Sequence, residues 1–234
     1  MEQVLGILYP RRCPVCGEIV MPKGELVCPG CVGKIRYVTE LKCKKCGKAI
    51  VQETKEYCRD CEENKRSFVQ GIVLVNYTQE VRSALGAVKY GNLRQNLDFF
   101  CQELVTRYDR QIGNWQAEAL IPVPLHPAKK RQRGFNQAEE IAGRFSKGLG
   151  IPVDTKLLCR RKRTTPQKDL NGRQRLANLI GAFGVSRAET GYKRVILVDD
   201  IYTTGSTAEA CTRALLKAGV EEVYVICIAA GMGD

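Results

Sequence analysis

Residues Val195 to Thr207 read VILVDDIYTTGST. The first four are aliphatic, and such a short apolar run predicts a strand that is buried on both faces of a parallel sheet. Two carboxylates and a turn of small residues follow this strand: Asp199, Asp200, Thr203, Thr204, Gly205, Ser206 and Thr207. Ser206 and Glu209 have the spacing of a capping box, which predicts that a helix begins near Ser206. A strand, a turn and a helix in this order indicate an α/β fold.

The turn and the carboxylates together favour binding of a sugar phosphate. Free backbone N–H groups at a helix amino terminus attract a phosphate group, and the two carboxylates can accept hydrogen bonds from sugar hydroxyls. Two other interpretations fit the same pattern: an ordinary strand, polar turn and capped helix, or a phospho-acceptor receiver domain. In a receiver domain the acidic pair ends the first strand and most of the domain follows, whereas few residues follow it here.

The stretch resembles the phosphoribosyl pyrophosphate (PRPP) loop of type I phosphoribosyltransferases. Two further segments, LIPVPLHPAKKRQRGFNQAEEIA from Leu120 to Ala142 and RTTPQKDLNGRQRLANLIGAF from Arg163 to Phe183, are similar to the ComF family, which is associated with competence for DNA uptake. The resemblance covers nearly the whole chain. It implies a type I phosphoribosyltransferase fold, in which helices flank a parallel sheet.

The resemblance also implies roles for single residues. Asp199 and Asp200 would be catalytic and hold the ribose, and the turn from 203 to 207 would bind its 5-phosphate. The loop after the strand Ala119–Pro124 would bind pyrophosphate, together with Mg²⁺, through Pro124, Leu125, His126, Lys129, Arg131 and Arg133. We expect His126, the only histidine, to position groups and not to transfer protons. The polar segment 160–178 resembles the mobile hood loop of these enzymes, and an exposed linker is the other interpretation.

Eight of the twelve cysteines form four C-x-x-C pairs that recur every fifteen residues. Two such pairs supply the four thiolates of a tetrahedral zinc site, and a redox function is the alternative for a single pair. The regular spacing predicts two structural zinc sites, with Gly17 and Gly47 in left-handed turns. The predicted ligands are Cys13, Cys16, Cys28 and Cys31 for one site and Cys43, Cys46, Cys58 and Cys61 for the other. We therefore expect a double zinc ribbon over residues 1–66 and a transferase-like domain over residues 67–234.

The transferase-like part alternates strands with helices. Strands are expected at Gly71–Tyr77 and Ala119–Pro124, and an amphipathic helix is expected around Leu97–Tyr108. A helix with Val81, Leu85 and Val88 on one face should be interrupted by Lys89, Tyr90 and Gly91. Asn136 with Glu139 should cap another helix. Since ligands gather at the carboxyl ends of parallel strands, the loops after Pro124 and Val198 should face one ligand.

The formal net charge is +12, and most of the excess lies in one segment. Residues 129–175 hold fourteen basic and four acidic side chains, including KKRQR at 129–133 and RRKR at 160–163. Such a segment can attract a nucleic acid or hold one pyrophosphate. Residues 1–66 hold thirteen basic and nine acidic side chains, a net charge of +4. Each site of four thiolates and one Zn²⁺ carries a charge of −2, so two loaded sites contribute −4 and the loaded zinc ribbons would be almost neutral. No apolar run is long enough to span a membrane, and MEQVLGILYPRRC lacks the pattern of a signal peptide, so we expect a cytoplasmic protein.

Three functions remain open at this point. The first is a PRPP-binding protein that handles single-stranded DNA during competence, with the zinc ribbons as a docking module for protein partners of a DNA-uptake apparatus. The second is a metabolic phosphoribosyltransferase with an unidentified acceptor, and the third is a non-catalytic nucleic-acid-binding module. Thr203 stands where purine-transferring relatives usually carry an aspartate, which argues against purine transfer. The sequence leaves open whether any turnover occurs.

Overall fold

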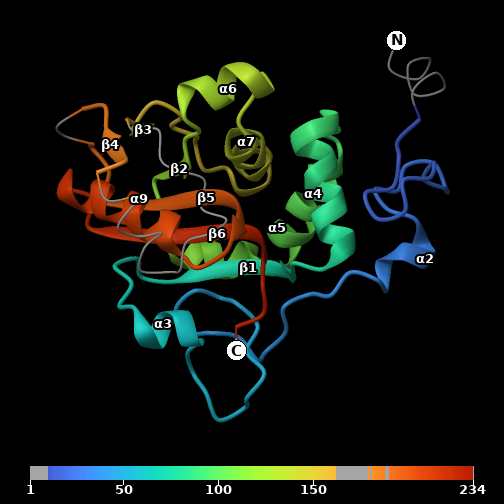
Figure 1. The fold of residues 1–234 in the computed structure, drawn as a ribbon, viewed down its shortest axis with the longest axis horizontal. Helices are drawn as coiled ribbons and strands as arrows, with labels where there is room; N and C mark the ends of the chain where they lie inside the picture. The colour runs from blue at the N-terminus through green and yellow to red at the C-terminus, as the bar shows by residue number, and fades with distance from the viewer. Residues whose placement is uncertain (1–9, 162–178, 180, 188–189, 234) are drawn as a thin grey trace.

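A sheet of four parallel strands forms the centre of the computed structural model, which describes residues 10–161, 179, 181–187 and 190–233 (Figure 1). The strands lie in the order β1 (Gly71–Asn76), β6 (Glu222–Ala230), β5 (Arg194–Tyr202) and β2 (Ala119–Pro122). A separate antiparallel pair joins β3 (Leu158–Arg160) to β4 (Phe183–Val185). All pairings in the main sheet are parallel, so the carboxyl ends of its strands share one edge.

Helices cover both faces of the sheet. The helices α4 (Gln79–Gly91), α5 (Asn96–Asn114) and α7 (Gln137–Leu149) pack with Ile196 and Val198 of β5 on one face. Helix α9 (Ser206–Lys217) packs with Val195 and Leu197 on the other face. All four of these strand residues are fully buried, which confirms the predicted two-sided strand. The α/β architecture predicted from the sequence is therefore confirmed.

Helix α4 differs from the sequence prediction at its end. It continues through Lys89 and Tyr90 to Gly91, and Asn92 closes it in the left-handed conformation at φ 55°. The expected interruption at Lys89 is therefore wrong. The extra half turn matters because it fixes Lys89 on a helix that packs against the sheet.

The two ribbons lie on opposite sides of the sheet. Cys13, Val20 and Cys31 of the first ribbon, which ends in the short helix α2 (Pro29–Val32), share a core with α4 and α5. Cys43, Cys46 and Cys58 of the second ribbon, which ends in α3 (Arg59–Glu63), share a core with β6 and α9. In Figure 1 the first ribbon lies beside α4, and the second lies below β1.

The segment between the ribbons covers an open edge of the sheet. The Val38 amide donates to the Leu74 carbonyl at 2.9 Å, and the Asn76 amide donates to the Arg36 carbonyl at 2.8 Å. These bonds satisfy backbone groups of β1, which is an edge strand of the main sheet. The chain thus crosses from one face to the other while pairing with β1.

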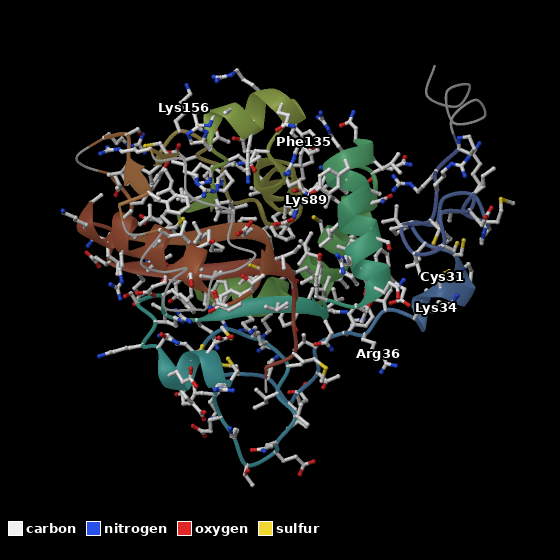
Figure 2. The ribbon with its side chains drawn as sticks, viewed as in Figure 1. Cys31, Lys34, Arg36, Lys89, Phe135 and Lys156 are labelled. Atoms are coloured by element: carbon white, nitrogen blue, oxygen red, sulfur yellow. The ribbon has the colours of Figure 1, made fainter. Side chains whose placement is uncertain are left out.

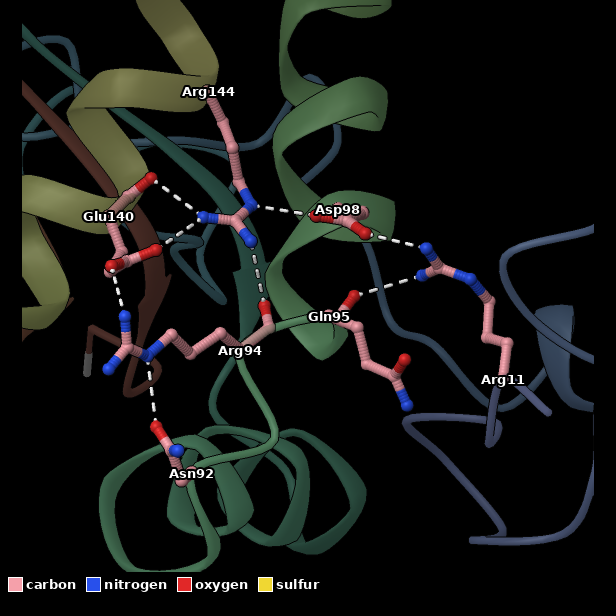
Figure 3. A network of polar contacts seen from close by, with 7 residues as sticks. All are labelled: Arg11, Asn92, Arg94, Gln95, Asp98, Glu140 and Arg144. Carbon is pink, nitrogen blue, oxygen red and sulfur yellow. Dashed lines mark hydrogen bonds and ion pairs between the residues drawn. The ribbon is translucent and has the colours of Figure 1, made fainter. Parts of the chain in front are cut away.

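A polar network fastens the first ribbon to the helices (Figure 3). Arg11 donates to Asp98 at 2.7 Å and to the Gln95 carbonyl at 3.0 Å. Asp98 also accepts from Arg144 at 2.7 Å, and Arg144 in turn contacts Glu140 at 3.0 Å. The network joins the start of the ribbon to α5 and α7.

The backbone of the second ribbon lies closer to β1 than a side chain at Gly47 would allow. The Gly71 amide donates to the Lys45 carbonyl at 2.7 Å. A Cβ at Gly47 would lie 2.6 Å from the Gly71 carbonyl oxygen, so the backbones can meet only without side chains there. At the other end of the chain, the Gly233 amide donates to the Ala49 carbonyl at 2.8 Å. The predicted division at residue 66 stays a prediction.

Within the described ranges, no helix has the length and apolar character needed to cross a membrane.

Candidate functional site

The candidate site lies where β5 and β2 end side by side. Pro122 is paired with Val198, and the Val123 amide donates to the Val198 carbonyl at 2.9 Å. β5 continues past Val198 through Asp199 and Asp200 to Tyr202, whereas β2 ends at Pro122. The segment 123–134 after β2 and the segment 199–205, which holds the last residues of β5 and the turn after it, therefore lie at the same edge of the sheet on neighbouring strands. The two predicted loops are adjacent because parallel pairing puts both strand ends together.

The acidic pair is closely packed and has a cationic neighbour. Asp200 is 9% exposed, and its carboxylate lies 2.7 Å from the Lys89 ammonium at the end of α4. Asp199 is half-buried, and its Oδ1 accepts from the Asp200 amide at 2.9 Å. Figure 2 labels Lys89 between α4 and the sheet. Lys89 was not among the site residues predicted from the sequence.

Burial and the neighbouring charge shift the pKa values at this pair. Burial raises the pKa of Asp199 well above its ordinary value, and repulsion from Asp200 raises it further. Burial alone would lower the pKa of Lys89, but attraction to Asp200 and Asp199 outweighs this effect and raises it. Lys89 therefore stays charged, whereas Asp199 holds its proton more tightly than an exposed aspartate. A hydrogen-bond donor or cation placed there would favour the ionised form of Asp199.

The turn after the acids has a shape that only glycine permits at its centre. Gly205 has φ 75°, and a Cβ at this position would collide with the Tyr202 hydroxyl. The Thr204 and Ser206 hydroxyls lie 2.9 Å apart, and Thr203 is exposed. Helix α9 begins directly after Gly205, so its positive end faces the site. This geometry suits a phosphate group.

The predicted capping box at this helix is wrong. Gly205, not Ser206, occupies the cap position, and no side chain caps it. The Glu209 carboxylate is fully buried and accepts from the Ser67 amide and hydroxyl, each at 2.7 Å. The sequence spacing misled because Glu209 has partners far away in the chain that satisfy it better than the helix end.

The segment after β2 contains a short helix where the sequence predicted only a loop. Helix α6 runs from Pro127 to Arg133, and Gly134 ends it at φ 82°. His126 caps its start, since its Nδ1 accepts from the Ala128 amide at 3.2 Å. Pro124 and Leu125 precede it and are half-buried. The histidine therefore contributes to local structure, and its predicted role in positioning groups of the ligand stays a prediction.

The basic side chains of α6 point in different directions. Lys130 pairs with Glu139 at 2.7 Å, whereas Lys129 and Arg131 are exposed. Arg133 is half-buried, donates to Gln137 at 2.9 Å, and lies close enough to Lys89 to repel its ammonium. Of the predicted pyrophosphate-loop residues, Arg133 thus interacts electrostatically with Lys89, the cationic neighbour of the acidic pair.

The second predicted basic cluster also approaches the acids through one residue. Arg160 of β3 is half-buried and stacks over the Phe183 ring at 5.4 Å. Burial lowers the pKa of Arg160, and attraction to Cys211 and Asp199 opposes that change. Arg161 donates to the Val185 carbonyl at 3.0 Å. Lys162, Arg163 and the rest of the predicted hood loop to residue 178 lie outside the described residues.

The thiols of the ribbons gather as the sequence spacing predicts. The sulfurs of Cys43, Cys46, Cys58 and Cys61 all lie within 4.8 Å of one another. The sulfurs of Cys13, Cys16 and Cys31 do the same, and the Cys28 sulfur is 3.9 Å from that of Cys16. Gly17 and Gly47 have φ 79° and 78°, as expected for the turns after each second cysteine. Four converging thiols fit the tetrahedral coordination of structural zinc.

The signal for Lys89 was present in the sequence but weak. A single lysine at the end of an amphipathic helix is normally a solvated charge that favours the helix dipole. Only the packing of α4 against the sheet places this ammonium at the end of β5. The side chain of the next residue, Tyr90, is by contrast 86% exposed. The Arg94 guanidinium lies over the Phe135 ring, 4.3 Å from the ring centre.

Comparisons with known proteins agree with this architecture. Residues 4–62 match the double zinc ribbon domain, and residues 132–234 match the phosphoribosyl transferase domain. A purine phosphoribosyltransferase structure from Pyrococcus horikoshii Ot3 covers 58% of this chain and 73% of its own at 20% identity, with a TM-score of 0.36. Together with the parallel sheet, the domain match establishes the predicted type I phosphoribosyltransferase fold behind a double zinc ribbon.

Several relatives match this chain over most of its length. "Competence protein F" of Haemophilus influenzae is 32% identical over 92% of this chain and 94% of its own length. "Competence protein ComFC" of Bacillus subtilis is 25% identical over 83% of this chain and 80% of its own. "DNA utilization protein YhgH" of Salmonella typhimurium is 26% identical over 95% of this chain and 98% of its own. With both domains and this extent of identity, the chain belongs to the ComF family of competence proteins.

Proposed function

We propose that the chain binds PRPP, or a related sugar phosphate, at the shared edge of β5 and β2, and that it acts in the uptake or handling of single-stranded DNA. One observation carries the first part: the acidic pair and the glycine turn end the strand that lies beside the one leading into the basic helix α6. The phosphate, the ribose and the pyrophosphate of PRPP would thus each meet a suitable protein group at this one edge of the sheet. The names of the relatives support the second part.

Each part of the site has a chemical role in this proposal. The turn from Thr203 to Thr207 binds the 5-phosphate through backbone N–H groups, and Asp199 and Asp200 accept from the ribose hydroxyls. Lys89, Arg133 and Arg160 supply positive charge near the pyrophosphate. Pro124, Leu125, His126, Lys129 and Arg131 shape the opposite side. Mg²⁺ bound with PRPP would neutralise pyrophosphate oxygens, and acidic Asp199 and Asp200 suit the hard oxygen chemistry of that ion.

If turnover occurs, pyrophosphate is displaced from ribose C1 by a nucleophile. The C1–O bond breaks with its electron pair leaving on pyrophosphate, and a new bond forms between C1 and the nucleophile. The ring passes through an oxocarbenium-like state, which nearby negative charge on Asp200 stabilises, and on Asp199 when a bound cation or donor favours its ionised form. Thr203 offers no carboxylate to take a proton from an incoming base, so a purine is a poor candidate acceptor.

Calorimetric titration with PRPP and Mg²⁺ tests the binding proposal. We expect heat of binding for the parent protein and at least several-fold weaker binding for the Asp199→Asn, Asp200→Asn double variant, because each charge-assisted hydrogen bond contributes roughly 1.5 to 3 kcal/mol. A matched control is Asp109→Asn with Glu221→Gln, since both residues are exposed and Glu221 directly precedes β6, at the edge of the sheet opposite the site. Equal affinity of the acid-pair variant and the control would overturn the assignment.

A competition experiment addresses DNA. Oligo-dT is titrated into protein with and without saturating PRPP. Mutual exclusion places both ligands in one site, and independent binding places DNA on another surface. Absence of oligo-dT binding at low salt would remove single-stranded DNA from the proposal and leave a metabolic phosphoribosyltransferase as the better function. Release of pyrophosphate on addition of candidate acceptors would support that alternative.

We also propose that each cysteine quartet holds one structural Zn²⁺. All eight ligands are thiols, which leaves no position for a catalytic water. Reduced thiolate sites suit a cytoplasmic location, and the ribbons offer a docking module for protein partners of the uptake apparatus. Metal analysis of freshly purified protein should give two zinc ions per chain. A single zinc ion per chain would contradict the proposal that each quartet, including Cys13, Cys16, Cys28 and Cys31, holds one ion.

A further inference from the structure

A buried arginine joins the second ribbon to the phosphate turn. Nη2 of Arg66 donates to the Thr204 carbonyl at 2.6 Å and approaches the Asp60 carbonyl at 3.3 Å. Arg66 is only 6% exposed. Asp60 lies inside the last C-x-x-C pair, between Cys58 and Cys61. One guanidinium thus contacts both a cysteine turn and the turn that follows the acidic pair.

This contact fixes the direction of a peptide group in the turn. In a planar trans peptide the carbonyl and the following N–H point in opposite directions. With the Thr204 carbonyl directed at Arg66, the Gly205 N–H is directed away from the ribbon. Arg66 therefore fixes the orientation of the Gly205 N–H, which is one of the donors that the proposed phosphate site uses. Its positive charge also adds to the attraction for an anion.

Other side chains of the ribbon support the same turn. The Lys48 ammonium donates to the Asp60 carboxylate at 2.6 Å and lies 5.9 Å from the centre of the Tyr202 ring. Phe68 contacts that ring edge-on, with 6.4 Å between the ring centres. The Tyr202 hydroxyl is the group that a side chain at Gly205 would strike. The turn is therefore packed on a tyrosine that the second ribbon holds in place.

A second tie lies one residue further along the chain. Ser67 donates through its amide and its hydroxyl to Glu209, which is fully buried in the first turn of α9. Arg66 and Ser67 therefore hold the turn and the helix start together. The first ribbon has a different attachment, since Arg11 binds Asp98 of α5. Its core contacts lie on the other face of the sheet, with α4 and α5.

We propose that Arg66 is a positioning residue for the phosphate turn, and that metal in the Cys43, Cys46, Cys58, Cys61 quartet sets the geometry of the turn through it. Metal in the first quartet does not have this effect. The inference rests on the proposed PRPP function, which it extends to regulation of the site by the state of one ribbon. Loss of metal from the second ribbon releases the Cys58–Cys61 turn, so that Asp60 no longer holds Arg66. Arg66 then loses its hydrogen bond to the Thr204 carbonyl.

The first test compares Arg66→Met with Arg59→Met, which removes an exposed arginine from the same C-x-x-C pair. Hydrogen exchange of the backbone from 203 to 209 is measured without ligand, and PRPP affinity is measured by calorimetry. We expect faster exchange and about tenfold weaker binding for Arg66→Met, in line with loss of one charge-assisted hydrogen bond. Arg66→Lys should recover part of both. Arg59→Met should behave like the parent.

Parental exchange in Arg66→Met would overturn the inference, whatever the ligand data show. If the parent protein fails to bind PRPP, the proposed function fails, but the exchange comparison still decides whether Arg66 holds the turn. The second test compares Cys61→Ser with Cys16→Ser, each of which removes one thiol from one quartet. We expect only Cys61→Ser to speed exchange at 203–209. Equal exchange in the two variants, with one zinc ion missing from each, would contradict the link to the second metal.

Discussion

The Lys89 ammonium lies 2.7 Å from the Asp200 carboxylate and joins the end of α4 to the end of β5. Both groups are largely buried, so the pair is shielded from solvent more than a surface ion pair. The lysine offsets the negative charge of the carboxylate at the point where the proposed ribose hydroxyls bind. The pair therefore links helix packing on one face of the sheet to the state of the site.

Replacing Lys89 by Met should weaken both stability and binding. The variant keeps the length of the side chain but leaves Asp200 without its cation, at a cost of about 1 to 3 kcal/mol. Chemical denaturation measures the stability, and calorimetry with PRPP and Mg²⁺ measures the binding. Arg82→Met on the same helix is the control, because Arg82 is exposed. If both variants matched the parent in affinity, Lys89 would have no role in the site.

Replacing Asp199 by Asn should stabilise the protein against rising pH while it weakens PRPP binding. Burial raises the pKa of Asp199 above its ordinary value of 3.8, so the folded protein holds this proton more tightly than the unfolded chain. The stability of the parent therefore falls as pH rises from 3.8 through the raised pKa. Melting temperatures measured over this range should fall less for Asp199→Asn. A parallel fall in the two proteins would show that another group causes the pH dependence.

Replacing Gly205 by Ala should disrupt the turn more than the same change at Gly219. Both glycines have positive φ, 75° and 92°, so alanine is strained at either position by about 1 to 2 kcal/mol. Only at Gly205 would the added methyl group also strike Tyr202, whereas the space at Gly219 is open. Denaturation should show a larger decrease in stability for Gly205→Ala, and PRPP binding should fall in that variant alone. Similar decreases in stability would mean that Tyr202 moves aside.

Reversing the exposed charges of α6 should weaken binding of single-stranded DNA. Lys129→Glu with Arg131→Glu removes charge that no described ion pair uses, whereas Lys130 is engaged by Glu139. Affinity for oligo-dT should fall, and the log–log dependence on salt should become shallower by about 0.7 for each phosphate that the variant no longer neutralises. Lys193→Glu with Lys217→Glu is the control of equal charge change at the opposite edge of the sheet, where both lysines are exposed. Equal weakening in both would indicate attraction by net charge without a defined surface.

The sequence by itself determined the parts whose pattern is local. The run Val195–Val198 predicted a buried strand because continuous aliphatic residues suit a strand covered on both faces. The spacing of the cysteines predicted the grouping of thiols, since two C-x-x-C turns fifteen residues apart can reach one centre. Asn136 predicted the start of α7, and its side chain does accept from the Ala138 amide at 3.2 Å. In each case the partner groups lie close together in the chain.

Only the tertiary structure decided the contacts between distant segments. Glu209 looked like half of a capping box, but it accepts from the amide and hydroxyl of Ser67, 142 residues away, in addition to Arg213 on its own helix. Lys89 looked like an ordinary helix-end charge, and nothing in the sequence pattern distinguished Arg66 from the other basic residues of the ribbons. Their roles follow from the packing of α4 and of the second ribbon against opposite faces of one sheet. The physical reason is that burial makes each unpaired charge costly, so the fold selects partners by proximity in space, which sequence spacing does not contain.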